Sequence, residues 1–329
     1  MPKTSTKDRF ALNGATMGTR WSVVLPAAPE DRDGLQDALQ QAVAQVDAQM
    51  STWRAESDLM RLNAAPLGSW VDLPAQLLAV LDTALQIGRL SDGAFEIAMG
   101  DAIAAWGFGP APADAQAIRA ALARKRQPSF TTLELDCANL RARKHGEMTL
   151  DLSGIAKGYG VDRLTEVLGA QGIPNALAAI DGELRALGNG PKGRGWSVAL
   201  ERPDPDIRAM HSVFELCDTA IATSGDYRHW VQVGAQRLGH TMDPARGAPL
   251  IDGPASVTVL APSCVEADAL ASAFMVLGEA AGRDLADRLG VEAVFLSEKD
   301  RSKTDHSDTR EGNQRKSSGR RPAAGNRVR

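Results

Sequence analysis

The chain has 329 residues, of which 43% are hydrophobic and 24% charged, a composition typical of a globular protein with one large domain or two ordinary ones. Its net charge of −4, spread over both signs, excludes an electrostatic case for nucleic acid as a main or specific partner. Its three cysteines are odd in number and far apart, which excludes a disulfide framework and a zinc knuckle.

The N-terminal segment predicts paired strands with no apolar stretch before them. Residues 10–25 alternate and carry β-branched and aromatic side chains around Gly14 and Gly18, which indicates a strand pair or a bulged strand. Residues 1–9 are polar and offer nothing that could serve as a signal peptide or a membrane span. As the sequence is written, we therefore expect a cytoplasmic protein.

Two parts of different character follow. From about residue 31 to residue 126, apolar periodicity predicts helices at residues 35–46, 77–85 and 114–126. From about residue 129 to residue 298, short strands alternate with turns rich in Gly, Pro and Asp, and helices are expected at residues 155–170 and 264–277. The expected strands lie at residues 148–152, 176–180, 196–200, 211–216, 255–260 and 291–296. Strands in runs favour an α+β fold over a doubly wound sheet.

The last segment, residues 299–329, is polar and basic. It holds ten Lys and Arg against four Asp and Glu and almost no large apolar residue. Such a segment cannot bury enough surface to offset its ordering entropy, so we expect a disordered basic tail. A solvated tail without function and an altered reading frame are alternative interpretations.

A carboxylate and a hydroxyl stand four positions apart in the apolar run of residues 267–277. Asp268 and Ser272 would share one face of a helix. A carboxylate buried there needs a partner, and oxygen ligands favour Mg²⁺ or Ca²⁺ over zinc. The alternative is that Asp268 caps the helix or lies on its solvent-exposed face.

Residues 151–160 predict a strand, a turn and the start of a helix. Free backbone N–H groups and the helix dipole attract phosphate at such a place, and Lys157 would lie in the first helical turn. The segment lacks the glycine spacing of a Walker A loop and of the dinucleotide fingerprint. An ordinary connection, capped by Asp151 or Ser153, is the alternative.

A histidine lies among polar residues farther along the chain. His240 begins the segment His240-Thr241-Met242-Asp243-Pro244, and Asp243 is close enough in the turn to orient it. A histidine beside a carboxylate can act as a base near neutral pH. A simple turn with a hydrogen-bonded imidazole is the alternative.

Together these segments resemble, in order, the motif set of the ApbE family of FAD:protein FMN transferases. The matching segments cover nearly all of residues 17–296. They are Met17-Gly18-Thr19, Ser51-Thr52-Trp53 with Ser57-Asp58-Leu59 and Arg61-Leu62-Asn63, Gly93-Ala94-Phe95-Glu96, residues 151–160 with Asp162, Gly182-Glu183, residues 222–227, residues 240–244 and residues 267–274. The resemblance implies one flavin transferase domain over residues 1–298, with a T-fold-like architecture of antiparallel sheets packed with helices.

The resemblance also implies a metal site and an FAD site that share the pyrophosphate. Mg²⁺, with Mn²⁺ as a possible substitute, would be bound by Asp268, Ser272 and the backbone carbonyl of Gly154. FAD would be the bound substrate. The implied flavin contacts are Met17, Trp53, Ala94, Phe95, Glu96, Asp151, Lys157 and Met242.

The implied activity is transfer of FMN from FAD to a Ser or Thr hydroxyl of a target flavoprotein, which forms a phosphodiester link and releases AMP. His240 is the expected base, with Asp243 orienting it. The alternatives are an FAD pyrophosphatase, which releases FMN and AMP, and a non-catalytic FAD-binding protein. Many relatives are exported or lipid-anchored, so a periplasmic or inner-membrane location is the alternative if the true start lies upstream.

The chain departs from the family pattern at three positions of the expected site. Ser272 replaces the commoner Thr, which keeps the hydroxyl but loses a methyl group that limits its rotamers. Asp181 stands where Gly is usual, and Glu96 stands where Asp is usual. The last two changes add or lengthen a carboxylate near the expected flavin pocket.

Overall fold

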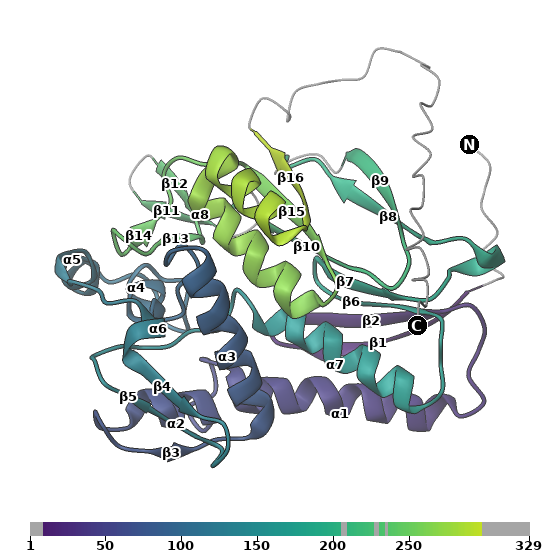
Figure 1. Ribbon diagram of the computed structural model, residues 1–329, viewed down its shortest axis with the longest axis horizontal. Coiled ribbons are helices and arrows are strands. Elements are labelled where there is room, and N and C mark those ends of the chain that lie inside the picture. The colour runs from purple at the N-terminus through teal and green to yellow at the C-terminus, as the bar shows by residue number, and fades with distance from the viewer. Residues whose placement is uncertain (1–8, 205–208, 227–229, 234–235, 298–329) are drawn as a thin grey trace, which may run out of the picture.

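The computed structural model describes residues 9–204, 209–226, 230–233 and 236–297, and the expected tail at residues 299–329 lies outside them. Its helices are α1 (Arg32–Met50), α2 (Asp58–Ala64), α3 (Ala75–Leu90), α4 (Gly100–Ala105), α5 (Ala115–Ala123), α6 (Ser129–Thr132), α7 (Ala156–Ala170), α8 (Cys264–Leu289) and the 3-10 turn η2 (Pro191–Gly193). Figure 1 shows their arrangement around the strands.

The strands pair in antiparallel fashion throughout. They are β1 (Phe10–Thr16), β2 (Thr19–Leu25), β3 (Val71–Asp72), β4 (Leu133–Asp136), β5 (Arg141–Lys144), β6 (Ala176–Ile180), β7 (Glu183–Leu187), β8 (Trp196–Glu201), β9 (Met210–Leu216), β10 (Ala220–Gly225), β11 (Trp230–Val233), β12 (Gln236–Gly239), β13 (Met242–Asp243), β14 (Ala248–Pro249), β15 (Ser256–Ala261) and β16 (Glu292–Leu296). The predicted α+β fold of helices and antiparallel sheets is confirmed. The division of the chain into a helical part, a mixed part and a tail stays a prediction.

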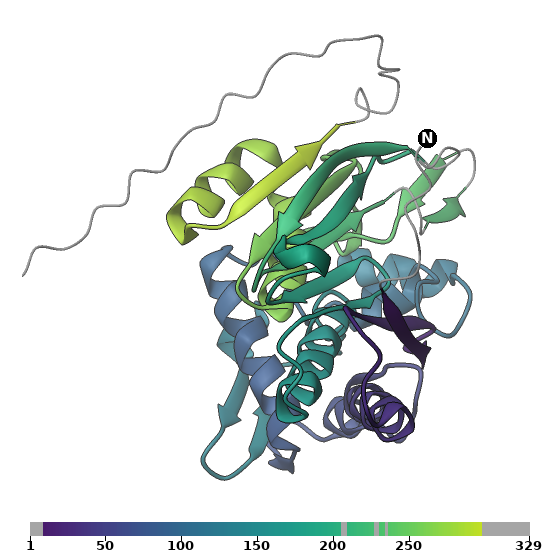
Figure 2. The same ribbon diagram turned by 90° about the vertical axis from the view of Figure 1, so that its right-hand side faces the viewer.

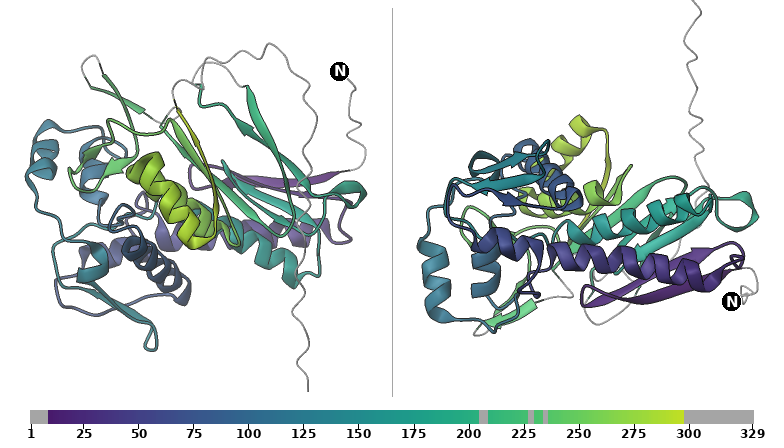
Figure 3. Two further views of the ribbon diagram at one scale, coloured as in Figure 1. Left: turned by 45° about the horizontal axis from the view of Figure 1, so that its top comes forward. Right: turned by 90° about the horizontal axis from the view of Figure 1, so that it is seen from below.

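A seven-stranded sheet forms the centre, in the order β1-β2-β6-β7-β10-β15-β16. One face is covered by helices, and α1 and α7 lie side by side below it (Figures 1 and 3). Trp21 on β2 and Ile180 on β6, which are direct partners in the register, are fully buried in this layer with Leu39 of α1 and Leu164 of α7. Alternation of buried and exposed residues along the strands therefore directs one apolar face toward the helices.

The hairpin of β8 and β9 packs on the opposite face of this sheet (Figure 2). Its buried side chains Trp196, Val198 and Leu216 form a separate cluster with Ala186 of β7 and Ile221 of β10. The sheet thus has a helical layer on one side and a two-stranded layer on the other.

A second group of elements packs beside α8. It comprises α2 to α6 and the three-stranded sheet β3-β5-β4, and α3 contacts α8 directly (Figure 1). Helices α4 and α5 also contact the β13–β14 hairpin, where Trp106 donates a hydrogen bond of 3.1 Å to the carbonyl oxygen of Gly247. Over the part of the chain that the structure describes, no helix is both long and apolar enough to span a bilayer.

The predicted strand at residues 148–152 is wrong, because this segment joins no sheet among the described residues. The side chain of Asn63 replaces a strand partner: its Oδ1 accepts the Leu150 N–H at 2.7 Å and its Nδ2 donates to the Leu150 carbonyl at 2.9 Å. The Asp151 N–H donates to the Ile97 carbonyl at 2.8 Å. These bonds hold an extended segment directly before α7 without a ladder.

Candidate active site

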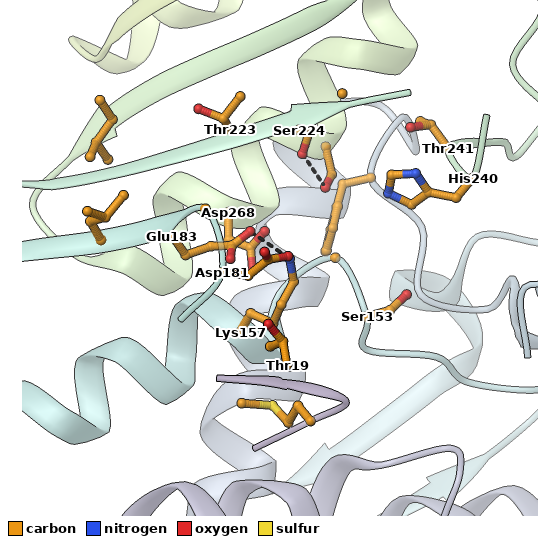
Figure 4. Close-up of a pocket in the computed structure, with 18 of the residues that line it drawn as sticks. Thr19, Ser153, Lys157, Asp181, Glu183, Thr223, Ser224, His240, Thr241 and Asp268 are labelled. Carbon is orange, nitrogen blue, oxygen red and sulfur yellow. Dashed lines mark hydrogen bonds and ion pairs between the residues drawn. The ribbon is translucent and has the colours of Figure 1, made fainter. Parts of the chain in front are cut away.

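A cavity of about 770 Å³ opens where α7, α8 and the strands β7, β8 and β10 meet. Figure 4 shows Lys157, Asp181, Glu183 and Asp268 together on one side of it and His240 on the other. Most of the predicted site residues line this cavity, namely Met17, Ala94, Phe95, Glu96, Asp151, Gly154, Lys157, His240, Met242, Asp268 and Ser272. Trp53 and Asp243 are not among the lining residues, and the Trp53 side chain is 66% exposed.

No side chain of the turn before α7 caps this helix. Asp151 accepts hydrogen bonds from the backbone N–H and the hydroxyl of Ser153, which tightens the turn but does not cap the helix. Ile155 occupies the N-cap position. Because N–H groups at a helix start carry partial positive charge, the α7 terminus can face an anion in the cavity.

Helices α7 and α8 approach closely at Gly158. A Cβ atom there would lie 2.3 Å from the Cys264 carbonyl oxygen and 2.7 Å from the Asp268 Cβ, so only glycine fits. The Gly158 N–H donates to Oδ2 of Asp268 at 2.9 Å. This bond links the buried carboxylate of α8 to the first turn of α7, and Asp268 does not cap its own helix, where Ser263 is the N-cap.

The three predicted metal ligands converge in the cavity. Asp268 is 3% exposed, and Ser272 follows it by one helical turn. A Cβ atom on Gly154 would lie 3.1 Å from the Ser272 Oγ, which in turn lies 3.2 Å from the Ser224 Oγ. Carboxylate, hydroxyl and carbonyl oxygens are the ligands that Mg²⁺ prefers, so the residues present fit this ion.

Lys157 is surrounded by carboxylates. Its Nζ lies 2.8 Å from Oε1 of Glu183 and 3.6 Å from Oδ2 of Asp181. Burial lowers the pKa of the Lys157 ammonium, but the charges of Glu183 and Asp268 raise it more, so its pKa lies above the usual range. Lys157 therefore stays protonated and can meet a phosphate.

The carboxylates around Lys157 are not fully neutralised by its single positive charge. Burial raises the pKa of the Glu183 carboxyl, to about 7, and that of Asp268 above its usual range. The Oε2 of Glu183 is buried without a hydrogen-bond partner among the described residues. Asp181, Glu183 and Asp268 around one ammonium leave a net negative charge, which a divalent cation would offset.

This ligand set depends on one carboxylate rather than on a cluster. Within the described ranges, no three His, Cys, Asp or Glu side chains are placed to hold a metal ion together. The predicted ligands are one carboxylate, one hydroxyl and one backbone carbonyl, so such a cluster is not required. A diphosphate would supply further oxygen ligands.

Two tight turns border the cavity. Met17 in the β1–β2 turn has φ 43° and is followed by Gly18 with φ 70°. Asp181 in the β6–β7 turn has φ 55°, a left-handed conformation that Asp tolerates better than most side chains. This tolerance explains how Asp can occupy a position where the family pattern leads one to expect Gly.

Glu96 shapes its loop through both carboxylate oxygens. Oε1 accepts the Ala98 N–H at 2.8 Å and Oε2 accepts the Ser129 N–H at 2.9 Å. The side chain therefore fixes the segment that carries Ala94 and Phe95 along the cavity wall. It borders the cavity while its charge is directed to backbone donors.

The carboxylate beside His240 is that of Asp226, not of Asp243. The Nδ1 of His240 lies 3.6 Å from Oδ1 of Asp226, which also accepts hydrogen bonds from the N–H and hydroxyl of Thr241. Asp243 instead accepts the Ala245 N–H at 2.9 Å within its own turn. Sequence reasoning missed Asp226 as the partner, although the hairpin register that places Trp230 opposite Gly239 brings the two flanking loops together.

One carboxylate outside the cavity holds three elements together. Asp162 of α7 accepts the N–H groups of Cys264 and Val265 at the start of α8, at 3.0 and 2.9 Å, and pairs with Arg185 of β7 at 2.5 Å. Burial raises the pKa of Asp162, while these donors favour its charged form. The elements that carry Lys157, Asp268 and Glu183 are thereby fixed relative to one another.

The cavity is typical of enzymes that act on phosphate esters. It combines a protonated lysine at a helix start, a buried carboxylate with a neighbouring hydroxyl, and a histidine. Comparison with known proteins assigns the chain to one family within this class. The ApbE family profile matches residues 17–295, so the chain belongs to the ApbE family. The family prediction from the sequence is confirmed.

Individual relatives agree with this assignment over most of their length. The chain is 35% identical to a Vibrio cholerae protein named FAD:protein FMN transferase, over 89% of each chain. It is 31% identical to an Escherichia coli K12 protein of the same name, over 91% of this chain and 86% of the relative. It also resembles the solved structure of the flavin transferase ApbE from Vibrio cholerae, with a TM-score of 0.77, 33% identity and coverage of 87% and 93%.

Proposed function

We propose that this protein transfers FMN from FAD to a Ser or Thr hydroxyl of a target protein with the help of a divalent metal ion. The observation that carries this proposal is the convergence of Gly154, Asp268 and Ser272 beside Lys157 and the start of α7. An FAD diphosphate placed there would meet the Lys157 ammonium and the positive end of the α7 dipole. The names of the relatives support the same activity.

In the reaction, a bond forms between the acceptor oxygen and the FMN-side phosphorus while the phosphorus–oxygen bond to AMP breaks. His240 takes the proton of the acceptor hydroxyl, and Asp226 lies beside its Nδ1. Lys157 and the positive end of the α7 dipole stabilise charge on the phosphate oxygens. Asp268, Ser272 and the Gly154 carbonyl would hold Mg²⁺, which would supply Lewis-acid polarisation of the diphosphate.

A comparison of two aspartates on α8 tests the proposal. Purified protein is incubated with FAD, Mg²⁺ and flavoproteins from the same genome, and mass spectrometry detects FMN on an acceptor. We expect Asp268→Ala to lower FMN transfer by roughly 100-fold or more, as removal of an electrostatic catalytic group does. Asp284→Ala is the matched control, because Asp284 lies on the same helix with its side chain 73% exposed.

The products distinguish the alternatives. Free FMN and AMP without a labelled acceptor would identify an FAD pyrophosphatase, and FAD that stays intact would identify a binding protein. Equal activity of Asp268→Ala and wild type would refute the metal assignment. Location in the cytoplasm stays a prediction.

A further inference from the structure

The edge of strand β8 borders the cavity. Five consecutive residues, 197–201, belong to the cavity lining. Successive side chains of a strand point to opposite faces, and here Val198 and Leu200 are buried while Ser197 and Ala199 are exposed. A strand can contribute residues of both faces to one cavity only when its edge, and so its backbone, faces that cavity.

This edge has no strand partner among the described residues. Strand β8 pairs with β9 on one side, and no other described strand joins this two-stranded sheet. Backbone bonds outside the regular elements do not involve residues 197–200 within the described ranges. Every second residue of such an edge directs its N–H and C=O groups outward, where they need a partner or water.

The side chains along the edge do not block another strand. Proteins usually protect open edges with lysine, proline or a bulge. Here Ser197 and Ala199 are small, and the irregularity in pairing with β9 lies at the far end, between Leu200 and Glu201. A second backbone can therefore approach β8 closely.

The edge is continuous with the candidate active site. The same cavity is lined by Ser224 of β10, which contacts Ser272, and by His240. Leu184 and Ile221 of the central sheet form an apolar wall beside β8. A segment lying along β8 would thus extend into the space that holds the reacting groups.

We propose that an extended segment of the target protein binds as a third strand on the β8 edge and so brings its acceptor hydroxyl into the cavity. This inference rests on the proposed function, which requires a polypeptide substrate. A polypeptide fits because its N–H and C=O groups alternate with the period of the open edge. A flavin has no such repeat.

This mode of binding has a clear consequence for recognition. Main-chain hydrogen bonds give affinity that does not depend on side chains, and only every second side chain of the bound segment faces the enzyme. With a rise of about 3.3 Å per residue, the five lining residues accommodate a segment of comparable length. The enzyme would therefore recognise a short stretch of its target around the acceptor residue.

A pair of variants on the hairpin tests the inference. Ala199 and Val213 are direct partners in the β8–β9 register, so their side chains share one face, but only Ala199 lines the cavity. We expect Ala199→Lys to raise the KM for a protein that the wild type labels with FMN by about tenfold or more, since lysine blocks strand addition. Val213→Lys, the matched control, is expected to change this KM by less than twofold.

Backbone substitution of the acceptor provides a second readout. A synthetic peptide spanning the labelled residue is made with a single N-methyl amide moved one position at a time. Strand addition predicts that transfer falls about tenfold at alternate positions, because only alternate N–H groups face β8. Equal effects at neighbouring positions would overturn the inference.

The remaining outcomes separate this inference from the proposed function. If the wild type labels no protein, the proposed function fails and the inference with it. If labelling occurs and Ala199→Lys behaves like Val213→Lys, only the inference fails. If Ala199→Lys weakens FAD binding by the same factor as it raises the acceptor KM, the edge belongs to the flavin site and the inference is overturned.

Discussion

Replacing Gly158 by Ala should destabilise the protein, although helix propensity alone predicts the opposite. In a helix interior Ala is favoured over Gly by about 1 kcal/mol. At this position, however, the added Cβ would lie 2.3 Å from the Cys264 carbonyl oxygen, a contact that only movement of α7 or α8 can relieve. The direction of the effect therefore depends on how closely the two helices approach.

The magnitude follows from two costs and one gain. Overpacking against backbone costs about 1–3 kcal/mol. Separation of the helices also weakens the 2.9 Å bond from the Gly158 N–H to Asp268, and such bonds to charged groups contribute about 1.5–3 kcal/mol. After subtraction of the propensity gain, we expect a loss of about 1.5–5 kcal/mol, or a fall in Tm of about 3–8 °C for a folded part of this size.

Urea and thermal unfolding measure this loss, and Gly169→Ala provides the control. Gly169 lies near the end of the same helix, is exposed, and has no atom within 4 Å of an added Cβ. Its replacement should gain up to about 1 kcal/mol. FMN transfer should fall with Gly158→Ala because Asp268 is displaced. Stability of Gly158→Ala equal to or above that of wild type would refute the close-contact reasoning.

Two further predictions concern His240 and the ion pairs that Asp101 of α4 forms with Arg124 and Arg126. Asp226→Asn should lower the rate of FMN transfer about tenfold or more, and Asp243→Asn much less, because the Asp226 carboxylate lies beside the imidazole; equal rates in transfer assays would contradict this assignment. Burial raises the pKa of Asp101, but Arg126 and its neighbour Arg124 lower it more, so the folded-state pKa lies below the usual value. The ion pairs thus stabilise the fold above about pH 4, and this contribution is lost as the pH falls through the lower folded-state pKa. Asp101→Asn should reduce the unfolding free energy by about 1–2 kcal/mol at pH 7 and by less in acid, as urea titrations at several pH values would measure; an equal loss at all pH values would argue against the ion pairs.

Local patterns in the sequence predicted most of the helices and several strands. The apolar periodicity before residue 171 anticipated α7, which begins one residue later than expected. The expected helix at residues 264–277 matches the first part of α8, because Gly278, with φ 74° and ψ 174°, breaks the helix before a second segment that ends at Leu289. Glycine is a common end signal, so this end could be predicted from the sequence, whereas the second segment, up to Leu289, was not predicted.

Site residues that lie close together in the sequence could be predicted to lie together in space, whereas contacts between residues far apart in the sequence were missed. Asp268 and Ser272 lie one turn apart, so their common face followed from helical geometry. The partner of His240 did not, because Asp226 comes from the other side of a hairpin and outcompetes the nearer Asp243, whose carboxylate is used by its own turn. Trp53 shows the same limit: its motif matched the family, yet its side chain is exposed outside the cavity.

The contacts of Asp162 give the two sides of the cavity different structural origins. By joining α7, α8 and β7, it makes the side of the cavity that carries Lys157, Asp268 and Glu183 a single framework whose geometry comes from the protein interior. The β8 edge belongs instead to a small hairpin outside the central sheet, and His240 lies between β12 and β13, which belong to two further hairpins. Changes in these hairpins can therefore alter which target is modified without rebuilding the framework, so a fixed chemistry can be adapted to new protein substrates.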